Sequence, residues 1–183
     1  MDLAHAGMGL KAYFLSQVRS QKTGVLVMDI LNSTIEGLGM GLPWSKAASY
    51  FSTLPETFNV QPVIAAVSDC VADADNRFKV YVRTQATYFS TLCDMLTLGG
   101  QLKGAAIDAT LAKLRDLWCA LFGPISDEIP VKHKRSSNGP SGFLFYYEMA
   151  IGSSFLVPKI YIPAARFLEN EDVPRIVVST EKP

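Results

Sequence analysis

The tripeptide Lys-x-Tyr occurs three times, at Lys11–Tyr13, Lys79–Tyr81 and Lys159–Tyr161, each time within an apolar run of β-prone residues. Successive side chains of a β-strand point to opposite faces, so the lysine and the tyrosine of each copy share one face. In the middle copy, Arg77 and Arg83 extend that face, and the alternate residues are apolar. The chain is therefore predicted to contain strands with one apolar face and one cationic, aromatic face.

The cationic face suggests a binding site for an anion. Lysine and arginine bind anions such as diphosphate, and the faces of phenol rings attract positive charge and cover electron-poor carbon atoms. A single copy would be ordinary, because a strand with a solvated lysine and a packed tyrosine is common. A general nucleic-acid binder is disfavoured, since 17 Lys and Arg are balanced by 17 Asp and Glu.

Pairs of helices alternate with pairs of strands along the chain. The apolar periodicities predict helices at 25–38, 43–54, 88–98 and 103–122, and strands at 10–15, 63–71, 77–84, 143–149 and 155–163. The repeat is helix, helix, strand, strand, at roughly 80 residues. Helices must cover the apolar face of the strands, which leaves the Lys-x-Tyr face on the other side. If such a sheet closes, an α+β barrel encloses a ligand.

The composition predicts neither a metal site nor a membrane partner. The spacing of Cys70, Cys93 and Cys119 fits no zinc pattern, and His5 and His133 have no neighbouring ligand set. We find no secretory signal and no apolar run of about 18 residues that would cross a membrane. Reduced cysteines and the missing signal predict a cytoplasmic protein.

Five segments resemble the fungal aromatic (indole) prenyltransferases of the dimethylallyltryptophan synthase type. These segments are residues 9–15, 69–71, 77–84, 94–100 and 157–163, and the resemblance extends over about residues 9 to 165. The most specific pair is the Arg-x-Lys-x-Tyr strand that starts at Arg77 and the Thr-Leu-Gly-Gly sequence that starts at Thr97. The resemblance implies an α-α-β-β prenyltransferase barrel, with about ten antiparallel strands inside and helices outside. This chain would hold about half of that barrel.

The resemblance also implies a reaction. Members of this family transfer a dimethylallyl group from dimethylallyl diphosphate to tryptophan or another indole in secondary metabolism, such as indole alkaloid biosynthesis, and they need no metal or other cofactor. The cationic positions that match the family's diphosphate site are Lys11, Arg77, Lys79 and Lys159. The tyrosines that match the family's carbocation shield are Tyr13, Tyr81 and Tyr161.

The chain departs from the family in ways that leave two functions open. The family's catalytic glutamate has no counterpart here, and Glu148 shares a strand face with Leu144 and Tyr146, which do not mark it as catalytic, so no catalytic residue is assigned. We predict a partial barrel domain at 1–166 and a divergent C-terminal tail at 167–183. Such a chain is either a prenyltransferase or a catalytically dead chain with a diphosphate-binding or regulatory role. The open strand edges of a half-barrel also predict a homodimer.

Overall fold

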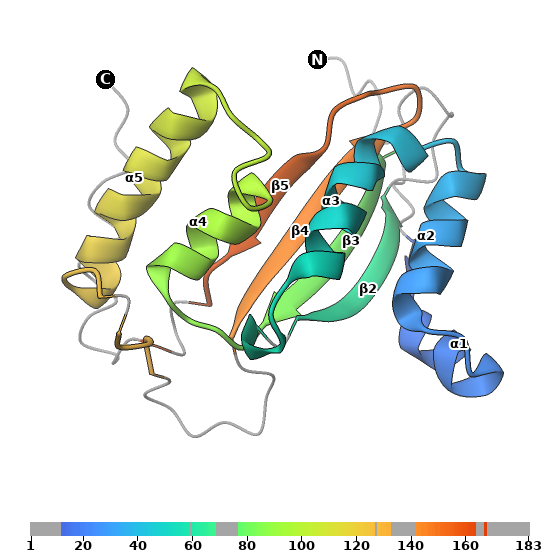
Figure 1. Ribbon diagram of the computed structural model, residues 1–183, viewed down its shortest axis with the longest axis horizontal. Helices are drawn as coiled ribbons and strands as arrows, with labels where there is room; N and C mark the ends of the chain where they lie inside the picture. The colour runs from blue at the N-terminus through green and yellow to red at the C-terminus, as the bar shows by residue number, and fades with distance from the viewer. Residues whose placement is uncertain are drawn as a thin grey trace, which may run out of the picture. The chain divides into compact units, whose positions relative to one another are not determined.

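The computed structural model describes residues 12–58, 60–68, 77–126, 128–132, 142–163 and Phe167. Its elements are, in chain order, β1 (Ala12–Phe14), α1 (Ser16–Thr23), α2 (Val27–Gly37), α3 (Gly41–Thr53), the 3-10 turn η1 (Glu56–Phe58), β2 (Gln61–Ser68), β3 (Arg77–Thr84), α4 (Phe89–Thr97), α5 (Ala105–Phe122), β4 (Phe143–Ala150) and β5 (Val157–Tyr161) (Figure 1). The five strands form one sheet in the order β1-β2-β3-β4-β5, so strands that neighbour each other in the sheet also follow each other in the chain.

The chain divides into two compact units. The first comprises residues 1–52, 61–82 and 146–159, and the second comprises residues 53–60, 83–145 and 160–183. Five strands are as many as the sequence predicts, and β3 begins and ends at the predicted residues. β1 ends one residue before the predicted strand does, and β2 begins two residues before its predicted start; residues 10–11 and 69–71 of those two predicted strands lie outside the described residues.

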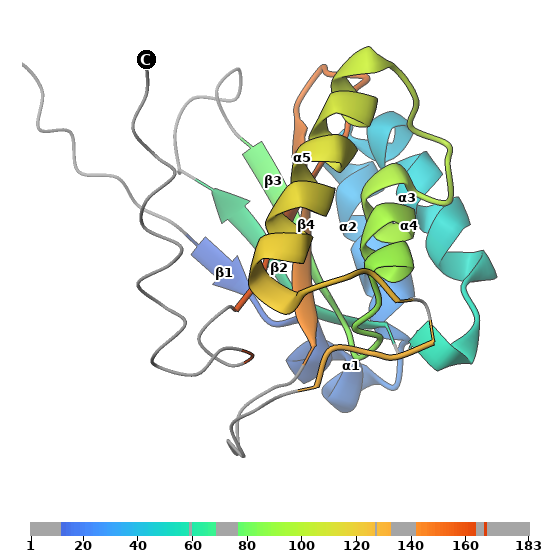
Figure 2. The same cartoon turned by 90° about the vertical axis from the view of Figure 1, so that its left-hand side faces the viewer.

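In the first unit, α2 and α3 cover the apolar face of the strands (Figures 1 and 2). Phe78 and Val80 of β3 are at most 2% exposed, and Phe78 lines a cavity together with Leu31 of α2. The ring of Phe51 on α3 meets Tyr147 of β4 edge-on, with 5.3 Å between ring centroids. The apolar side chains therefore face the helices, and the alternate side chains of β3 and β4 lie on the opposite face.

Helix α1 is the one described helix that the sequence patterns do not predict. Its eight residues are mostly polar, and only Ser16 is buried. The side-chain amide of Gln17 donates a hydrogen bond to the carbonyl of Pro62, which ties the helix to β2. The helix ends at Gly24, whose N–H still donates to the carbonyl of Ser20 at 2.8 Å and whose φ of 74° turns the chain out of the helix.

Aromatic side chains form the core of the second unit. The ring of Trp118 on α5 meets Phe89 of α4 at 5.5 Å and Phe143 of β4 at 5.9 Å, both edge-on. Phe167 packs on Phe143 at 5.4 Å and is only 2% exposed. Helix α4 is capped by Leu98, a fully buried residue with a φ of 52°. These contacts pack α4 and α5 against the first part of β4.

Chain register is fixed where β1 meets β2. The two strands run antiparallel, with Ala12 opposite Val67, Tyr13 opposite Ala66 and Phe14 opposite Ala65.

None of the helices in the described ranges has both the length and the apolarity that a membrane crossing requires.

Candidate functional site

The face of β3 that turns away from the helices carries the predicted cations. Along β3, the odd-numbered residues from Arg77 to Arg83 are partly or fully exposed, and the residues between them are buried. The prediction that Arg77, Lys79, Tyr81 and Arg83 share a face is therefore confirmed. Arg77, Lys79 and Tyr81 belong to the first unit.

The carboxylate of Glu148 on β4 lies among three of the predicted cations, two from β3 and one from β5. Its Oε1 is 3.2 Å from Nη1 of Arg77, and its Oε2 is 3.1 Å from Nζ of Lys159. Nζ of Lys79 lies 3.7 Å from the same Oε2. One side chain of β4 thus joins cations from β3 and from β5.

The charges of this cluster shift the pKa values of two of its members. Burial raises the pKa of Glu148, but the hydrogen bond from Lys159 and the positive charges of Lys159, Lys79 and Arg77 outweigh it, so the net pKa lies below the usual 4.5. Burial lowers the pKa of Lys159, and the hydrogen bond and charge of Glu148, with a smaller contribution from Tyr146, raise it above 10.5. Glu148 and Lys159 are therefore both charged at neutral pH.

A pair of tyrosine rings lies beside the cations. Tyr81 of β3 and Tyr146 of β4 are stacked, with ring centroids 5.3 Å apart and an interplanar angle of 30°. Nζ of Lys159 lies 5.3 Å from the centroid of Tyr146, and Nζ of Lys79 lies 5.9 Å from it. The site thus combines fixed positive charge with the π-faces that attract a cation.

The structure does not assign the other predicted site residues to this cluster. Lys11 belongs to the part of the chain that the structure does not describe. Tyr13 on β1 is 60% exposed, and no contact joins it to the cations around Glu148 among the described residues. Tyr161, at the end of β5, is 51% exposed and belongs to the second unit. The described residues of the first unit thus bring together four of the predicted site residues, Arg77, Lys79, Tyr81 and Lys159.

Glu148 and Tyr146 are two members of the site that the sequence did not identify as binding residues. A period of two along β4 places them together on the face opposite Phe143, Phe145 and Tyr147, as the sequence predicts. The pattern assigns their face but not their partners. It could not have shown that Glu148 lies opposite three cations.

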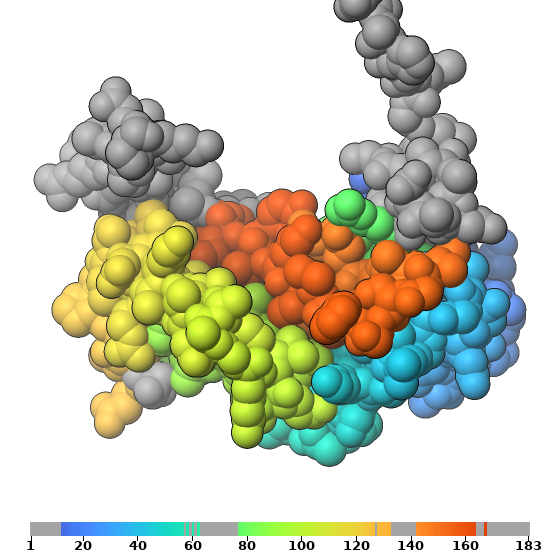
Figure 3. All heavy atoms as spheres, turned by 90° about the horizontal axis from the view of Figure 1, so that it is seen from above, coloured from blue at the N-terminus to red at the C-terminus, as the bar shows by residue number. Residues whose placement is uncertain are grey.

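Two of the three cations around Glu148 are well exposed, since the side chain of Arg77 is 59% exposed and that of Lys159 is 42% exposed. The turn between β4 and β5, coloured orange in Figure 3, lies at the molecular surface, and Phe155 within it is 75% exposed. Lys159 follows this turn. Within the described residues, no group of three or more His, Cys, Asp or Glu is placed to hold a metal ion.

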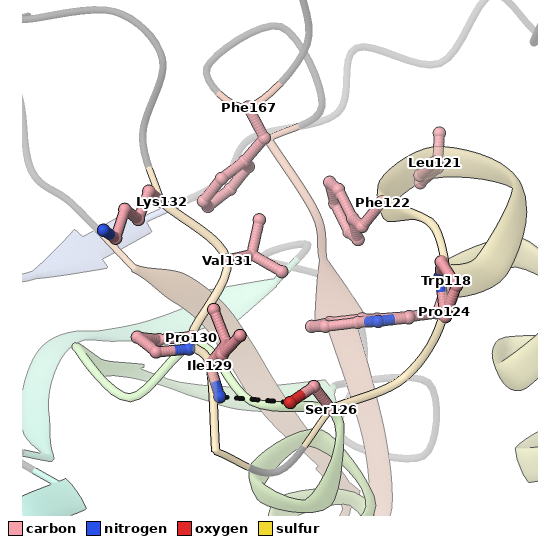
Figure 4. A pocket seen from close by; sticks show the side chains of 10 residues that line it. All are labelled: Trp118, Leu121, Phe122, Pro124, Ser126, Ile129, Pro130, Val131, Lys132 and Phe167. Carbon is pink, nitrogen blue, oxygen red and sulfur yellow. Dashed lines mark hydrogen bonds between the residues drawn. The ribbon is translucent and has the colours of Figure 1, made fainter.

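Two cavities, one in each unit, are lined by described residues. One, in the first unit, has a volume of about 380 Å³ between β1, α1 and α2, and Phe14, Leu31 and Phe78 line it. The other, of about 400 Å³ in the second unit, is lined by the aromatic rings of Trp118 and Phe167 (Figure 4). In its wall the N–H of Ile129 donates to Oγ of Ser126 at 3.2 Å. Neither cavity contains a predicted site residue.

Comparison with known proteins identifies the family. The family model described as tryptophan dimethylallyltransferase matches residues 1–175. The chain is 32% identical over 184 residues to a 4-O-dimethylallyl-L-tyrosine synthase of Claviceps purpurea, covering 93% of this chain and 40% of that protein. It is 29% identical over 176 residues to a 7-dimethylallyltryptophan synthase of Aspergillus fumigatus, covering 93% of this chain and 37% of that protein. The chain therefore spans roughly two fifths of the length of these relatives.

Solved structures support the same assignment. The crystal structure of AnaPT from Neosartorya fischeri superposes with a TM-score of 0.68 at 26% sequence identity, covering 88% of this chain and 37% of that chain. The NotF prenyltransferase superposes with a TM-score of 0.63 at 22% identity, covering 85% of this chain and 36% of that chain, and so supports the fold alone. The predicted fold, part of an α-α-β-β prenyltransferase barrel, is thereby confirmed. The chain belongs to the tryptophan dimethylallyltransferase family.

Proposed function

We propose that this chain carries the diphosphate site of an aromatic prenyltransferase, which transfers a dimethylallyl group from dimethylallyl diphosphate to tryptophan or another indole. The observation that carries the proposal is the cluster of Arg77, Lys79 and Lys159 beside the stacked rings of Tyr81 and Tyr146. Its cations suit an anionic leaving group, and its rings suit a carbocation next to that group.

The proposed reaction uses both parts of the cluster. The carbon–oxygen bond of dimethylallyl diphosphate breaks, and the diphosphate leaves with the electron pair. Arg77, Lys79 and Lys159 stabilise the negative charge that develops on it, and because they are already in place, little reorganisation is needed. The rings of Tyr81 and Tyr146 stabilise the allylic cation. An aromatic carbon of the indole then forms the new bond to the allyl carbon and loses its proton.

Glu148 is unsuited to be the base that removes that proton. Its pKa is lowered, and its two carboxylate oxygens already contact three cations. We assign no catalytic base among the described residues. The three cations around Glu148 provide the positive charge that a divalent metal would otherwise supply to the leaving group, so the proposed transfer needs no cofactor.

The direct test is a transfer assay with the purified chain, dimethylallyl diphosphate and either tryptophan, simple indoles or tyrosine, with and without EDTA. Product formation that is insensitive to EDTA is the expected result, and turnover that requires Mg²⁺ would contradict the proposal. Binding of dimethylallyl thiolodiphosphate without turnover would support the alternative, a catalytically dead chain that binds diphosphate. Absence of binding would reject both functions.

Charge reversal locates the site. Lys79→Glu should abolish binding of the thiolodiphosphate, because it replaces attraction by repulsion at the centre of the cluster. Lys46→Glu is the matched control, since Lys46 lies exposed on α3, the helix that covers the opposite face of the strands. Equal effects of the two substitutions would show that the β3 face is not the site.

We further propose that residues 1–166 form the barrel portion, that 167–183 form a divergent tail, and that the protein acts in the cytoplasm. Two observations make the position of this boundary worth testing. The family match extends to residue 175, and Phe167, just after the proposed boundary, packs on Phe143. Stepwise C-terminal truncation at residues 175 and 166, followed by thermal unfolding, measures where the folded portion ends.

A further inference from the structure

The carboxylate of Glu148 lies deeper than the cations that surround it. Its side chain is 11% exposed, whereas the side chains of Arg77 and Lys159 are 59% and 42% exposed. Lys79, at 20%, is intermediate. An anion that approaches from the solvent therefore meets the cations before it meets Glu148.

This depth decides between two possible roles of a carboxylate in an anion site. A competing counter-ion would lie between the cations and the solvent, and an incoming anion would have to displace it. Glu148 is instead less exposed than each of the three cations that it contacts, with distances between 3.1 and 3.7 Å. Each lysine ammonium has three N–H donors. Lys159 donates one of them to Oε2 of Glu148, whereas Lys79, at 3.7 Å, is held by charge attraction without a hydrogen bond.

Long cationic side chains lose conformational freedom when they bind a ligand. Lysine and arginine each lose rotamer entropy on immobilisation, and this cost weakens binding unless the side chains are ordered beforehand. Glu148 orders three such side chains at once. The rings of Tyr81 and Tyr146 add a second constraint, because both lysines lie over Tyr146.

We propose that Glu148 is a positioning residue of the anion site, which holds Arg77, Lys79 and Lys159 at the spacing that a diphosphate group requires. This inference rests on the function proposed above. Glu148 acts through the cations and does not touch the ligand. It selects for diphosphate because two linked phosphate groups can use a fixed spacing of cations, whereas a single small anion depends mainly on the net charge.

The test compares two anions on four versions of the full chain: wild type, Glu148→Gln, Glu148→Asp and Glu36→Gln. Glu36 lies exposed on α2, so Glu36→Gln controls for the loss of one negative charge. Affinity for inorganic diphosphate and for sulfate is measured by calorimetric titration at neutral pH, after circular dichroism has shown that each variant is folded.

We expect Glu148→Gln to weaken diphosphate binding by about tenfold or more, since three side chains lose their common anchor. Sulfate binding should stay the same or become tighter, because the net positive charge of the cluster rises. Glu148→Asp keeps the charge on a shorter side chain and should restore part of the preference for diphosphate. Glu36→Gln should bind both anions as the wild type does.

Several results would overturn the proposal. Tighter binding of both anions to Glu148→Gln would make Glu148 a competing counter-ion, and an equal loss for both would indicate general disruption of the site. Unchanged binding of both would show that the cations need no anchor. A wild-type chain that binds no diphosphate would reject the proposed function itself, which separates that failure from a failure of the role of Glu148.

Discussion

Glu148 keeps its negative charge in a largely buried position because three cations surround it. Taking a lone carboxylate out of water is costly, but here the hydrogen bond from Lys159 and the charges of Lys79 and Arg77 exceed that cost. The same balance raises the pKa of Lys159. At the residue scale, the site is therefore a coupled group of charges, and any change to one member alters the others.

This coupling predicts how stability depends on pH. The folded-state pKa of Glu148 lies below 4.5, so its contribution to the free energy of unfolding is fully present above the unfolded-state value and is lost as the pH falls through the folded value. Glu148→Gln should lower the free energy of unfolding by about 2 kcal/mol at pH 7, and the deficit should shrink in acid. Urea unfolding of both proteins between pH 7 and pH 3 measures this deficit.

An exposed glutamate on α2 serves as the control. Glu36→Gln should change the free energy of unfolding at pH 7 by less than about 0.5 kcal/mol, since surface substitutions generally do so. A deficit for Glu148→Gln that stays constant down to pH 3 would show that the carboxylate stabilises the fold through packing and hydrogen bonding, without its charge.

At the element scale, the start of β4 depends on a glycine that no other residue can replace. Gly142 has a φ of 85°, and a Cβ added to it would lie 1.9 Å from the carbonyl oxygen of Thr84 at the end of β3. That oxygen belongs to the backbone, so no side-chain rotation relieves the clash. The side chain of Thr84 is itself fixed, because its hydroxyl donates to the carbonyl of Phe58.

Gly142→Ala should therefore lower the free energy of unfolding by about 3 kcal/mol or more. Gly152→Ala is the matched control, because Gly152 has a similar φ of 75° and an added Cβ there would meet nothing within 4 Å beyond its chain neighbours. It should cost only the strain of a left-handed alanine, about 1–2 kcal/mol. Thermal and urea unfolding compare the two, and equal losses would mean that the chain around Thr84 shifts to admit the methyl group.

The elements were predictable to the extent that their patterns are local. β3 was predicted to its end residues because cationic or tyrosine side chains alternate with other, mostly apolar side chains along it. Helix α1 was missed because it contains one large apolar residue, Val18, and a single such residue gives no 3.6-residue apolar period. Glu148 was not identified as a binding residue because it pairs with Arg77, 71 residues earlier, and no local pattern encodes the register between such strands.

At the scale of the whole molecule, the sheet formed by the described strands ends in β1 on one side and in β5 on the other. An outer strand presents backbone N–H and carbonyl groups along one side and readily pairs with another chain. Tyr13 and Phe14 on β1 are 60% and 56% exposed, which adds apolar surface to that edge. We expect the 183-residue chain to associate with a second copy of itself through such an edge.

Sedimentation velocity tests this association. The wild-type chain should sediment as a dimer or a larger species. Phe14→Arg should shift it toward monomer, because a charge at the edge strand opposes pairing. Leu42→Arg, at a residue of α3 that is 74% exposed, should leave the distribution unchanged. A wild-type chain that sediments as a stable monomer at all concentrations would exclude the dimer.

The ion pairs of Glu148 also help to set the register of β4 against its neighbouring strands. Sliding β4 by two residues, about 6.8 Å, would return each side chain to its own face, so the alternation of apolar and polar residues cannot tell the two alignments apart. The charged side chains distinguish the two alignments, because such a slip would move Glu148 beyond the 3.1–3.7 Å at which it now contacts cations of β3 and β5. Glu148 and the cations that form the proposed anion site thus also favour one strand alignment over the others that keep the same faces.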